Sequence, residues 1–162
     1  MDFVPLTLMN IYYNPESSNS PALLLDILLS EVFIMKEKQI KVLKVAPGKL
    51  PEMVVLNNDL RSLQEAVSIG ADYVGLIEII ELEKEACLLC NEEGKLNGLE
   101  PNRRLGNDII CGTFYITGQD KEGNLASLPH AMMEKYSHRF LELEYYSEED
   151  VVKATVMRFF TW

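Results

Sequence analysis

Short apolar segments joined by hairpin-length connections constrain this chain more than any other feature of its sequence. Residues 40–45 alternate as a strand does, with Ile40 and Val42 on one face and Leu43 and Val45 on the other. Pro47 and Gly48 supply turn chemistry, and residues 53–56 have the pattern of a second strand. Because so short a connection joins antiparallel neighbours, this segment predicts a β-hairpin.

The same pattern continues further along the chain. Residues 57–59, Asn-Asn-Asp, supply an N-cap and an acid suited to the dipole of a helix that ends near Gly70. Strands are expected over residues 76–82, 86–91 and 109–117. The order of these elements predicts an α+β domain, with a mixed, largely antiparallel sheet of about five strands and two or three helices.

The C-terminal half carries further helix signals. Ser127 is expected to cap a helix that runs through Phe140, and residues 147–160 place apolar side chains at helical spacing. Pro101 is expected to start a single helical turn over residues 101–105.

One hydrophobic core is predicted between the sheet and the helices. Gly112, inside the strand expected over 109–117, marks a bulge or the close approach of another group. The residues expected to share this core are Leu43, Val55, Leu63, Val67, Ile77, Ile79, Leu89, Phe114, Ile116, Met132 and Tyr136.

Residues 1–34 differ from the rest of the chain, since they hold four acidic side chains and no Lys or Arg. Their Leu-rich second half could form a short helix, but its apolar side chains cover nearly the whole circumference. The codons of Glu31 and Val32 could instead encode a ribosome-binding sequence, so we hypothesise that the natural chain starts at Met35.

The predicted organisation has three parts. Residues 1–34 are an extension, and residues 35–146 form a single α+β domain. Residues 147–162 are expected to form a C-terminal amphipathic helix that packs on this domain or extends from it.

The charge balance argues against direct binding to nucleic acid. The 162-residue chain has 25 Asp and Glu against 15 Lys and Arg, which gives a net charge of −10. Proteins that bind phosphate backbones normally present a basic face. We therefore expect no direct contact with nucleic acid.

Cysteine content and hydropathy predict a cytoplasmic protein. The three cysteines, Cys87, Cys90 and Cys111, suit a reducing compartment better than a disulfide scaffold. No run reaches the roughly 18 apolar residues of a membrane span, and no secretory signal is visible. No membrane partner is expected.

The sequence contains no established catalytic or metal-binding motif. Cys87 and Cys90 are three apart, so in a strand their side chains point to opposite faces and cannot share one metal. Nucleophile elbows, phosphate loops and zinc-helix motifs are absent. We expect no catalytic residue, no metal and no cofactor. The carboxylates of Glu81, Glu83 and Glu85 could bind a divalent cation, mimic DNA phosphates, or simply form a solvated strand end.

A patch of polar side chains at turns is the predicted ligand- or partner-binding site. An Arg beside amides and a carboxylate suits recognition of a phosphate, a carboxylate or a peptide amide. The alternative is structural: Asn91 caps its own turn, and Arg103 pairs with Asp108 or Glu92 to fix the loops. The residues of this predicted site are Asn91, Glu92, Asn102, Arg103, Asp108 and Thr113.

Four segments, taken in order, resemble a known protein family. They are residues 40–49, 89–95, 101–105 and 108–114. Together they are similar to a family of small uncharacterised proteins from Firmicutes, their phages and their integrative elements, over about residues 39–140. The family often has two prolines before Asn-Arg, where this chain has Glu100 and Pro101. The resemblance implies an intracellular protein linked to mobile elements, with a domain of unknown function and no assigned reaction.

Three classes of function are open at this point. The first is a non-enzymatic accessory protein of a phage or mobile element that binds a host protein or small ligand through the loop patch. The missing catalytic motifs and the Met, Phe and Tyr content of the C-terminal helices favour it. The second is a small hydrolase or transferase that uses the same patch. The third is an acidic DNA mimic that inhibits a nucleic-acid enzyme.

Overall fold

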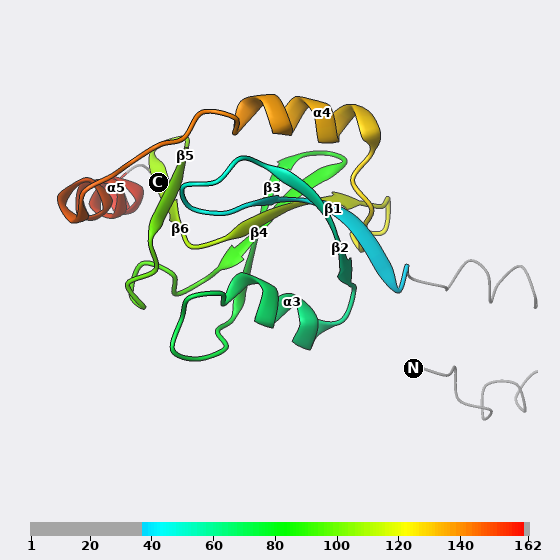
Figure 1. Cartoon of the computed structure of the whole chain (residues 1–162), viewed down its shortest axis with the longest axis horizontal. Coiled ribbons are helices and arrows are strands. Elements are labelled where there is room, and N and C mark those ends of the chain that lie inside the picture. The colour runs from blue at the N-terminus through cyan, green and yellow to red at the C-terminus, as the bar shows by residue number, and fades with distance from the viewer. Residues whose placement is uncertain (1–36, 161–162) are drawn as a thin grey trace, which may run out of the picture. The chain divides into compact units, whose positions relative to one another are not determined.

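An antiparallel sheet of six strands forms the centre of the domain (Figure 1). The structure, a computed structural model, describes residues 37–160. The strands run in the order β2-β1-β7-β4-β3, and β8 pairs with β7. Their bounds are β1 Gln39–Val45, β2 Glu52–Asn57, β3 Ile77–Glu83, β4 Ala86–Asn91, β7 Phe114–Gln119 and β8 Leu125–Ala126. The expected α+β class is confirmed.

Two hairpins supply the outer parts of this sheet. β1 pairs with β2 from Gln39 opposite Asn57 to Lys44 opposite Glu52, as the alternating pattern and the Pro-Gly turn predict. β3 and β4 form the second hairpin. β7 then lies between β1 and β4, which joins the two hairpins into one sheet. β4 is buried along its whole length because it has a strand on each side and packed side chains on both faces.

A second, two-stranded sheet corrects two of the expectations. It consists of β5 (Pro101–Leu105) and β6 (Asp108–Cys111), which pair antiparallel. The helical turn predicted over residues 101–105 is therefore wrong. Pro101 is compatible with both structures, because Pro is tolerated at the first residue of a strand as well as at the first position of a helix. The single strand predicted over residues 109–117 is divided between β6 and β7.

Gly112 makes this division possible. Its φ is +86°, in the left-handed region that favours glycine. A Cβ at this position would lie 2.7 Å from Cδ1 of Leu99, so any other residue would also require the Leu99 side chain to shift. The expected close approach at Gly112 is confirmed, and here the chain leaves the small sheet and enters the large one.

Three helices complete the described part of the chain: α3 (Leu60–Val67), α4 (His130–Arg139) and α5 (Glu148–Phe160). The Asp59 carboxylate caps α3 by accepting a hydrogen bond from the Ser62 amide at 2.9 Å, as predicted. α4 begins two residues later than expected, with Pro129 and not Ser127 at the N-cap position. Ser127 does not cap it, because its hydroxyl accepts a bond from the Lys41 amide and donates to Glu37. None of the helices within residues 37–160 has the length and apolar character to cross a membrane.

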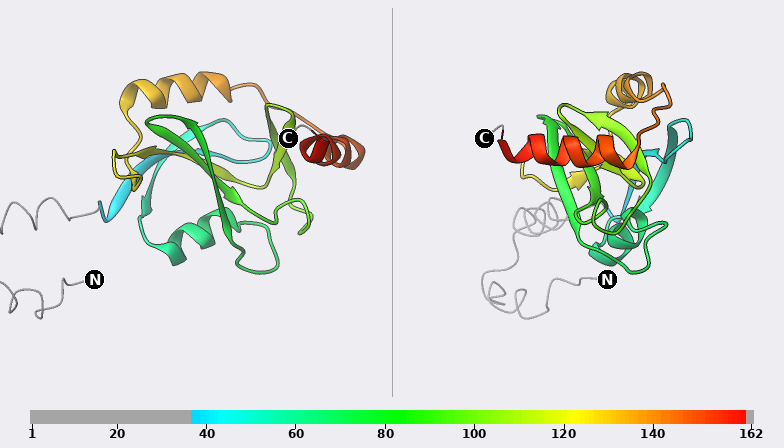
Figure 2. Two further views of the ribbon diagram at one scale, coloured as in Figure 1. Left: turned by 180° about the vertical axis from the view of Figure 1, so that it is seen from behind. Right: turned by 90° about the vertical axis from the view of Figure 1, so that its left-hand side faces the viewer.

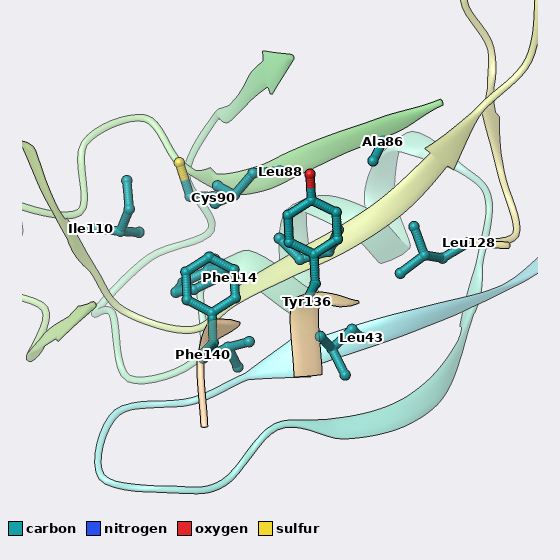
Figure 3. Close-up of a cluster of buried hydrophobic side chains, with 11 residues drawn as sticks. Leu43, Ala86, Leu88, Cys90, Ile110, Phe114, Leu128, Tyr136 and Phe140 are labelled. Carbon is teal, nitrogen blue, oxygen red and sulfur yellow. The ribbon is translucent and has the colours of Figure 1, made fainter. Parts of the chain in front are cut away.

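The sheet has a hydrophobic cluster on each face, so the prediction of one core is wrong. The α4 side contains Leu43, Phe114, Ile116, Tyr136 and Phe140, with others shown in Figure 3. The α3 side contains Ile40, Val42, Leu63, Val67, Leu89 and Tyr115. Val55 and Ile79, both predicted to be in the core, lie on the outermost strands and are about half exposed.

α5 forms a third cluster at one end of the large sheet, where it packs against β6 (Figure 2). Its buried residue Ala154 contacts the cluster that contains Ile109, Cys111 and Leu99. The start of α5 has a reciprocal cap: the Asp150 carboxylate accepts a hydrogen bond from the Ser147 amide, and the Ser147 hydroxyl accepts one from the Asp150 amide.

Candidate functional site

The six residues of the predicted binding patch do not meet at one place. Two of them, on β5, are fully buried. Three line a small cleft between β3, β6, α5 and the loop after β4. The last is buried at the junction of β6 and β7. The two buried residues on β5 are Asn102 and Arg103, and the three that line the cleft are Asn91, Glu92 and Asp108. The residue at the junction of β6 and β7 is Thr113.

Arg103 has internal partners, but they are not the expected ones. Its Nε and Nη2 donate to the carbonyl of Phe140, both at 3.2 Å, and Nη2 also donates to the carbonyl of Lys49 at 3.0 Å. Nη1 donates to Oδ1 of Asn102 at 2.8 Å. Within residues 37–160 no carboxylate forms an ion pair with this guanidinium, so the predicted pairing with Asp108 or Glu92 is wrong.

These bonds give Arg103 a structural role. Phe140 is the C-cap of α4, and Lys49 belongs to the connection between β1 and β2. Asn102 donates to the carbonyls of Val45 and Gly112 at 2.9 and 2.8 Å. Burial lowers the pKa of Arg103, and carbonyl oxygens satisfy its donors. The buried pair therefore fastens β5 to α4 and to the β1–β2 hairpin.

Asn91 also behaves as the structural alternative predicts. Its Oδ1 accepts a hydrogen bond from the Glu93 amide at 2.9 Å, which closes the turn that follows β4. Its Nδ2 donates to the hydroxyl of Ser68 at 3.3 Å. Gly75 lies so close that a Cβ there would be 2.8 Å from Nδ2 of Asn91. Both ends of the amide are thus used to position loops.

The cleft contains a cluster of four charged side chains, which we call the ion-pair cluster: Glu78, Lys95, Asp108 and Arg158. Arg158, on α5, bonds Oε1 of Glu78 on β3 at 2.6 Å and Oδ2 of Asp108 on β6 at 3.3 Å. Lys95 pairs with the other oxygen of Asp108. The hydrogen bond that Arg158 donates to Glu78 raises the pKa of Arg158. Two acids and two bases balance, and the cluster connects α5 to both sheets.

The cleft is too small and too inert for an obvious substrate site. Its cavity volume is about 40 Å³, well below the roughly 300–1,000 Å³ of typical small-molecule pockets. Burial, and then Glu78, raise the pKa of Cys90 to about 12, and burial raises the pKa of Cys111 to about 11. Both thiols are therefore protonated at neutral pH and are poor nucleophiles. Within the described residues, no three His, Cys, Asp or Glu side chains gather as metal ligands would.

The outward side of α5 carries four exposed apolar residues, which we call the α5 stripe. Val152, Val156, Phe159 and Phe160 have exposed fractions of 61%, 48%, 75% and 83%. Their spacing of four, three and one residues places them on one side of a helix. Ala154, only 4% exposed, lies on the opposite side and packs on β6. The helix is therefore fixed on one side by packing and by Arg158, and it presents apolar surface on the other.

Sequence reasoning missed Lys95, Arg158 and the division of α5 into two sides. Charged residues far apart in sequence give no signal of pairing before the fold is known. A signal for the stripe was present, however. Apolar residues occur around most of the circumference of α5, and a helix that packs on one side of a domain cannot bury all of them.

Comparison with protein families matches residues 40–141 to the family described as Domain of unknown function (DUF3846). The match covers more than half of the chain. The chain belongs to the DUF3846 family. This confirms the resemblance expected over residues 39–140. No curated protein and no solved structure matches the chain.

The DUF3846 match includes only part of the candidate site. The match begins in β1 and ends just after α4, so it includes both sheets, the Arg103 fastening and three members of the ion-pair cluster. Arg158 and the α5 stripe lie beyond it. The DUF3846 domain thus uses its charged cleft to hold a helix that lies outside the matched region.

Proposed function

We propose that this protein is a non-enzymatic accessory protein of a phage or mobile element, and that it binds a host protein through the α5 stripe and the adjoining ion-pair cluster. The observation that carries the proposal is the exposure of the stripe on a helix whose opposite side is fixed. Contiguous apolar surface rimmed by charge marks interaction sites in soluble proteins.

Energetics support the stripe as the anchor of an interface. Complete burial of a Val or Phe side chain contributes about 1.5–3 kcal/mol. Two neighbouring aromatic anchors on a helix can act as a hot spot, because aromatic residues dominate the binding energy of many interfaces. Since Ala154 and Arg158 already hold α5 in place, little additional ordering of the helix opposes binding.

The chemistry of the stripe also describes its partner. Apolar anchors at these spacings fit an apolar groove that receives one side of a helix. Glu148 and Glu149 begin α5, both are exposed, and the whole chain carries a net charge of −10. A host protein with an apolar groove and a basic rim would satisfy both features. We place this binding in the cytoplasm, since all three cysteines are unbridged.

The enzymatic alternative has less support. A hydrolase or transferase needs its polar side chains to converge on an opening where a substrate can sit. Asn102 and Arg103 are instead buried and occupied with backbone groups, and the cavity beside Asp108 measures only about 40 Å³. The geometry therefore favours binding over catalysis.

The test compares capture of a host protein by matched variants. Tagged wild-type protein and the Phe159→Ser/Phe160→Ser double variant are crosslinked in host cells, and captured proteins are identified by mass spectrometry. Leu96→Ser is the control, because Leu96 is 88% exposed and lies outside the stripe. A partner is then purified and its affinity measured directly.

The expected result is a partner that binds wild type and Leu96→Ser with equal affinity. We expect the double variant to bind at least about tenfold more weakly, which corresponds to a loss of about 1.4 kcal/mol. Added salt should weaken the remaining interaction if the basic rim contributes. Equal capture of one specific partner by all three proteins would exclude the α5 stripe as the docking surface.

A further inference from the structure

The two outer strands of the large sheet differ in how their free edges are protected. β3 carries Glu78, Glu81 and Glu83, and its pairing with β4 is irregular between Glu81 and Glu83. Charges and bulges on an edge strand are the usual means by which proteins prevent further strand pairing. β3 is therefore well protected at its edge.

β2 lacks most of these features. Its sequence is Glu-Met-Val-Val-Leu-Asn, with no Lys, no Pro and a regular register with β1. Its single charge, Glu52, forms an ion pair with Lys44 on β1 at 3.2 Å. Within residues 37–160 no strand pairs with the outer edge of β2. Met53 and Val55 lie on the same face of this strand and are 58% and 52% exposed.

We propose that two copies of this chain associate through β2, as antiparallel edge strands, to form one continuous sheet. Val54 lies on the twofold axis, and Met53 of each copy lies opposite the partner's Val55. An edge of this kind is a template for another strand, since its outward backbone groups need hydrogen-bond partners. This contact is separate from the α5 stripe and does not depend on the proposed function.

The sequence of β2 selects both the occupant and the register. A twofold axis perpendicular to the sheet joins like faces of the two copies. Residues that pair across the contact must therefore point to the same face, so their numbers are both odd or both even. Centring on Val54 gives two Met53–Val55 pairs on one face and a Val54–Val54 pair on the other. Centring on Val55 would place Met53 opposite an amide, that of the partner's Asn57. Apolar cross-strand pairs each contribute roughly 0.2–1 kcal/mol, which favours the first register.

Charge also favours a second copy. The only ionised side chain of β2 is Glu52, and in the proposed register it lies opposite the partner's Leu56, away from the other Glu52. No like charges face each other across the contact, and Lys44 already compensates Glu52. The contact is short, six residues from each copy, so we expect a weak dimer with a Kd of about 1 µM to 1 mM.

The test uses two complementary charge substitutions, Met53→Lys and Val55→Glu. Both positions are exposed, and Val55 lies opposite Lys41 on β1, so a carboxylate there is compatible with the folded monomer. Sedimentation equilibrium over about 5–500 µM, spanning the expected Kd, measures association of wild type, each variant and their equimolar mixture. Leu96→Lys is the surface control, and circular dichroism checks that every variant is folded.

We expect wild type and the Leu96→Lys control to dimerise equally. Each β2 variant should associate at least about tenfold more weakly, because an unpaired charge lies opposite an aliphatic side chain. The mixture should recover association, because the new ammonium of one variant then faces the new carboxylate of the other.

Three results would overturn the proposal. The first is wild-type protein that stays monomeric over the whole range. The second is a dimer that both β2 substitutions leave unchanged, especially one that the Phe159→Ser/Phe160→Ser variant abolishes, since that result assigns the contact to the α5 stripe. The third is a mixture that does not associate, which contradicts the pairing of Met53 with the partner's Val55.

Discussion

Arg103 holds three backbone segments together without a carboxylate. The carbonyl of Phe140, at the end of α4, accepts two of its hydrogen bonds. The C-terminal end of a helix carries a partial negative charge, so this carbonyl suits a buried cation. The carbonyl of Lys49 and the side chain of Asn102 complete the set. A planar group with five donors fits this arrangement, whereas an ammonium does not.

Substitution of Arg103 should therefore lower stability. We expect Arg103→Lys to decrease the free energy of unfolding by about 2–4 kcal/mol, because several charge-assisted bonds are lost and carbonyls are left buried without donors. Arg103→Ala should decrease it further. The measurement is urea denaturation at neutral pH.

Arg61→Lys provides the matched control for this prediction. Arg61 is on the surface, and among the described residues its ion pair is with Glu65 at i+4, so the same substitution should change stability by less than about 0.5 kcal/mol. Equal midpoints for wild type and Arg103→Lys would show that these bonds contribute nothing to folding.

The sequence predicts that Arg103 has a fixed partner, but it cannot identify the partner. Asp108 is the nearest acid after it in the chain, yet the groups that bind the guanidinium belong to residues 37 and 54 positions away. The acceptors are backbone carbonyls, which every type of residue has. A backbone acceptor leaves no signature in the side chains, so only the fold reveals it.

Strands and helices were more predictable than their junctions. The sequence correctly places β1, β2 and β4, and in β1 the alternation of apolar side chains separates its two sides. The prediction of a helical turn over residues 101–105 is wrong because a Pro at the first position is compatible with a strand as well as with a helix. The start of α4 shifted because Glu37 and Lys41, almost 90 residues earlier, bind the residue that was expected to be its cap.

Among the strands, β7 should be the most sensitive to truncation of a core residue. Phe114 is fully buried and packs edge-on against Phe140, with ring centroids 5.1 Å apart. We expect Phe114→Ala to lower the free energy of unfolding by about 3–5 kcal/mol, measured by urea denaturation. Leu96→Ala, at an exposed loop position, should have almost no effect. A Phe114→Ala variant as stable as wild type would contradict the placement of this side chain in the core.

α5 depends on the ion-pair cluster for its attachment. Arg158→Ala leaves Glu78 and Asp108, both largely buried side chains, without the cation that they share. We expect hydrogen exchange of the amides in residues 148–160 to become faster while exchange in β4 and β7 is unchanged. Mass spectrometry of exchanged peptides measures both.

Lys153→Ala is the control for α5, because Lys153 is exposed and, in the part of the chain that the structure describes, its ion pair is with Glu149 on the same helix. Its effect on exchange should be small. If Arg158→Ala and Lys153→Ala give the same exchange in α5, packing through Ala154 alone holds the helix.

On the scale of the whole molecule, the sheet has two hydrophobic faces, and this arrangement explains the errors in the predicted core. The pattern of β1 already separates Ile40 and Val42 from Leu43 and Val45, and the structure confirms this separation. The sequence does not show which strands are outermost. Val55 and Ile79 have core-like residue types, but strands at the edge of a sheet have fewer neighbours to cover them.

The buried thiol of Cys90 and the buried phenol of Tyr115 lie on opposite faces of this sheet, and they predict how stability changes at alkaline pH. Burial raises the pKa of Cys90 from 9.0 to about 12, and that of Tyr115 from 10.0 to about 12. The native state therefore keeps these protons at a pH where the unfolded chain loses them. Their contribution to stability is complete below pH 9 and is lost as the pH rises from 9 towards 12.

The free energy of unfolding should decrease with pH at a defined rate. While only the unfolded state is deprotonated, each such group lowers the free energy of unfolding by about 1.4 kcal/mol per pH unit. Urea denaturation at pH 8, 9, 10 and 11 should therefore show stability decreasing above about pH 9, and more steeply above about pH 10. Cys90→Ala and Tyr115→Phe each remove one titrating group, so each should reduce the slope in its own pH range. Identical slopes in wild type and both variants would mean that neither group keeps its proton in the folded protein, and that the two faces of the sheet admit water more freely than their packing indicates.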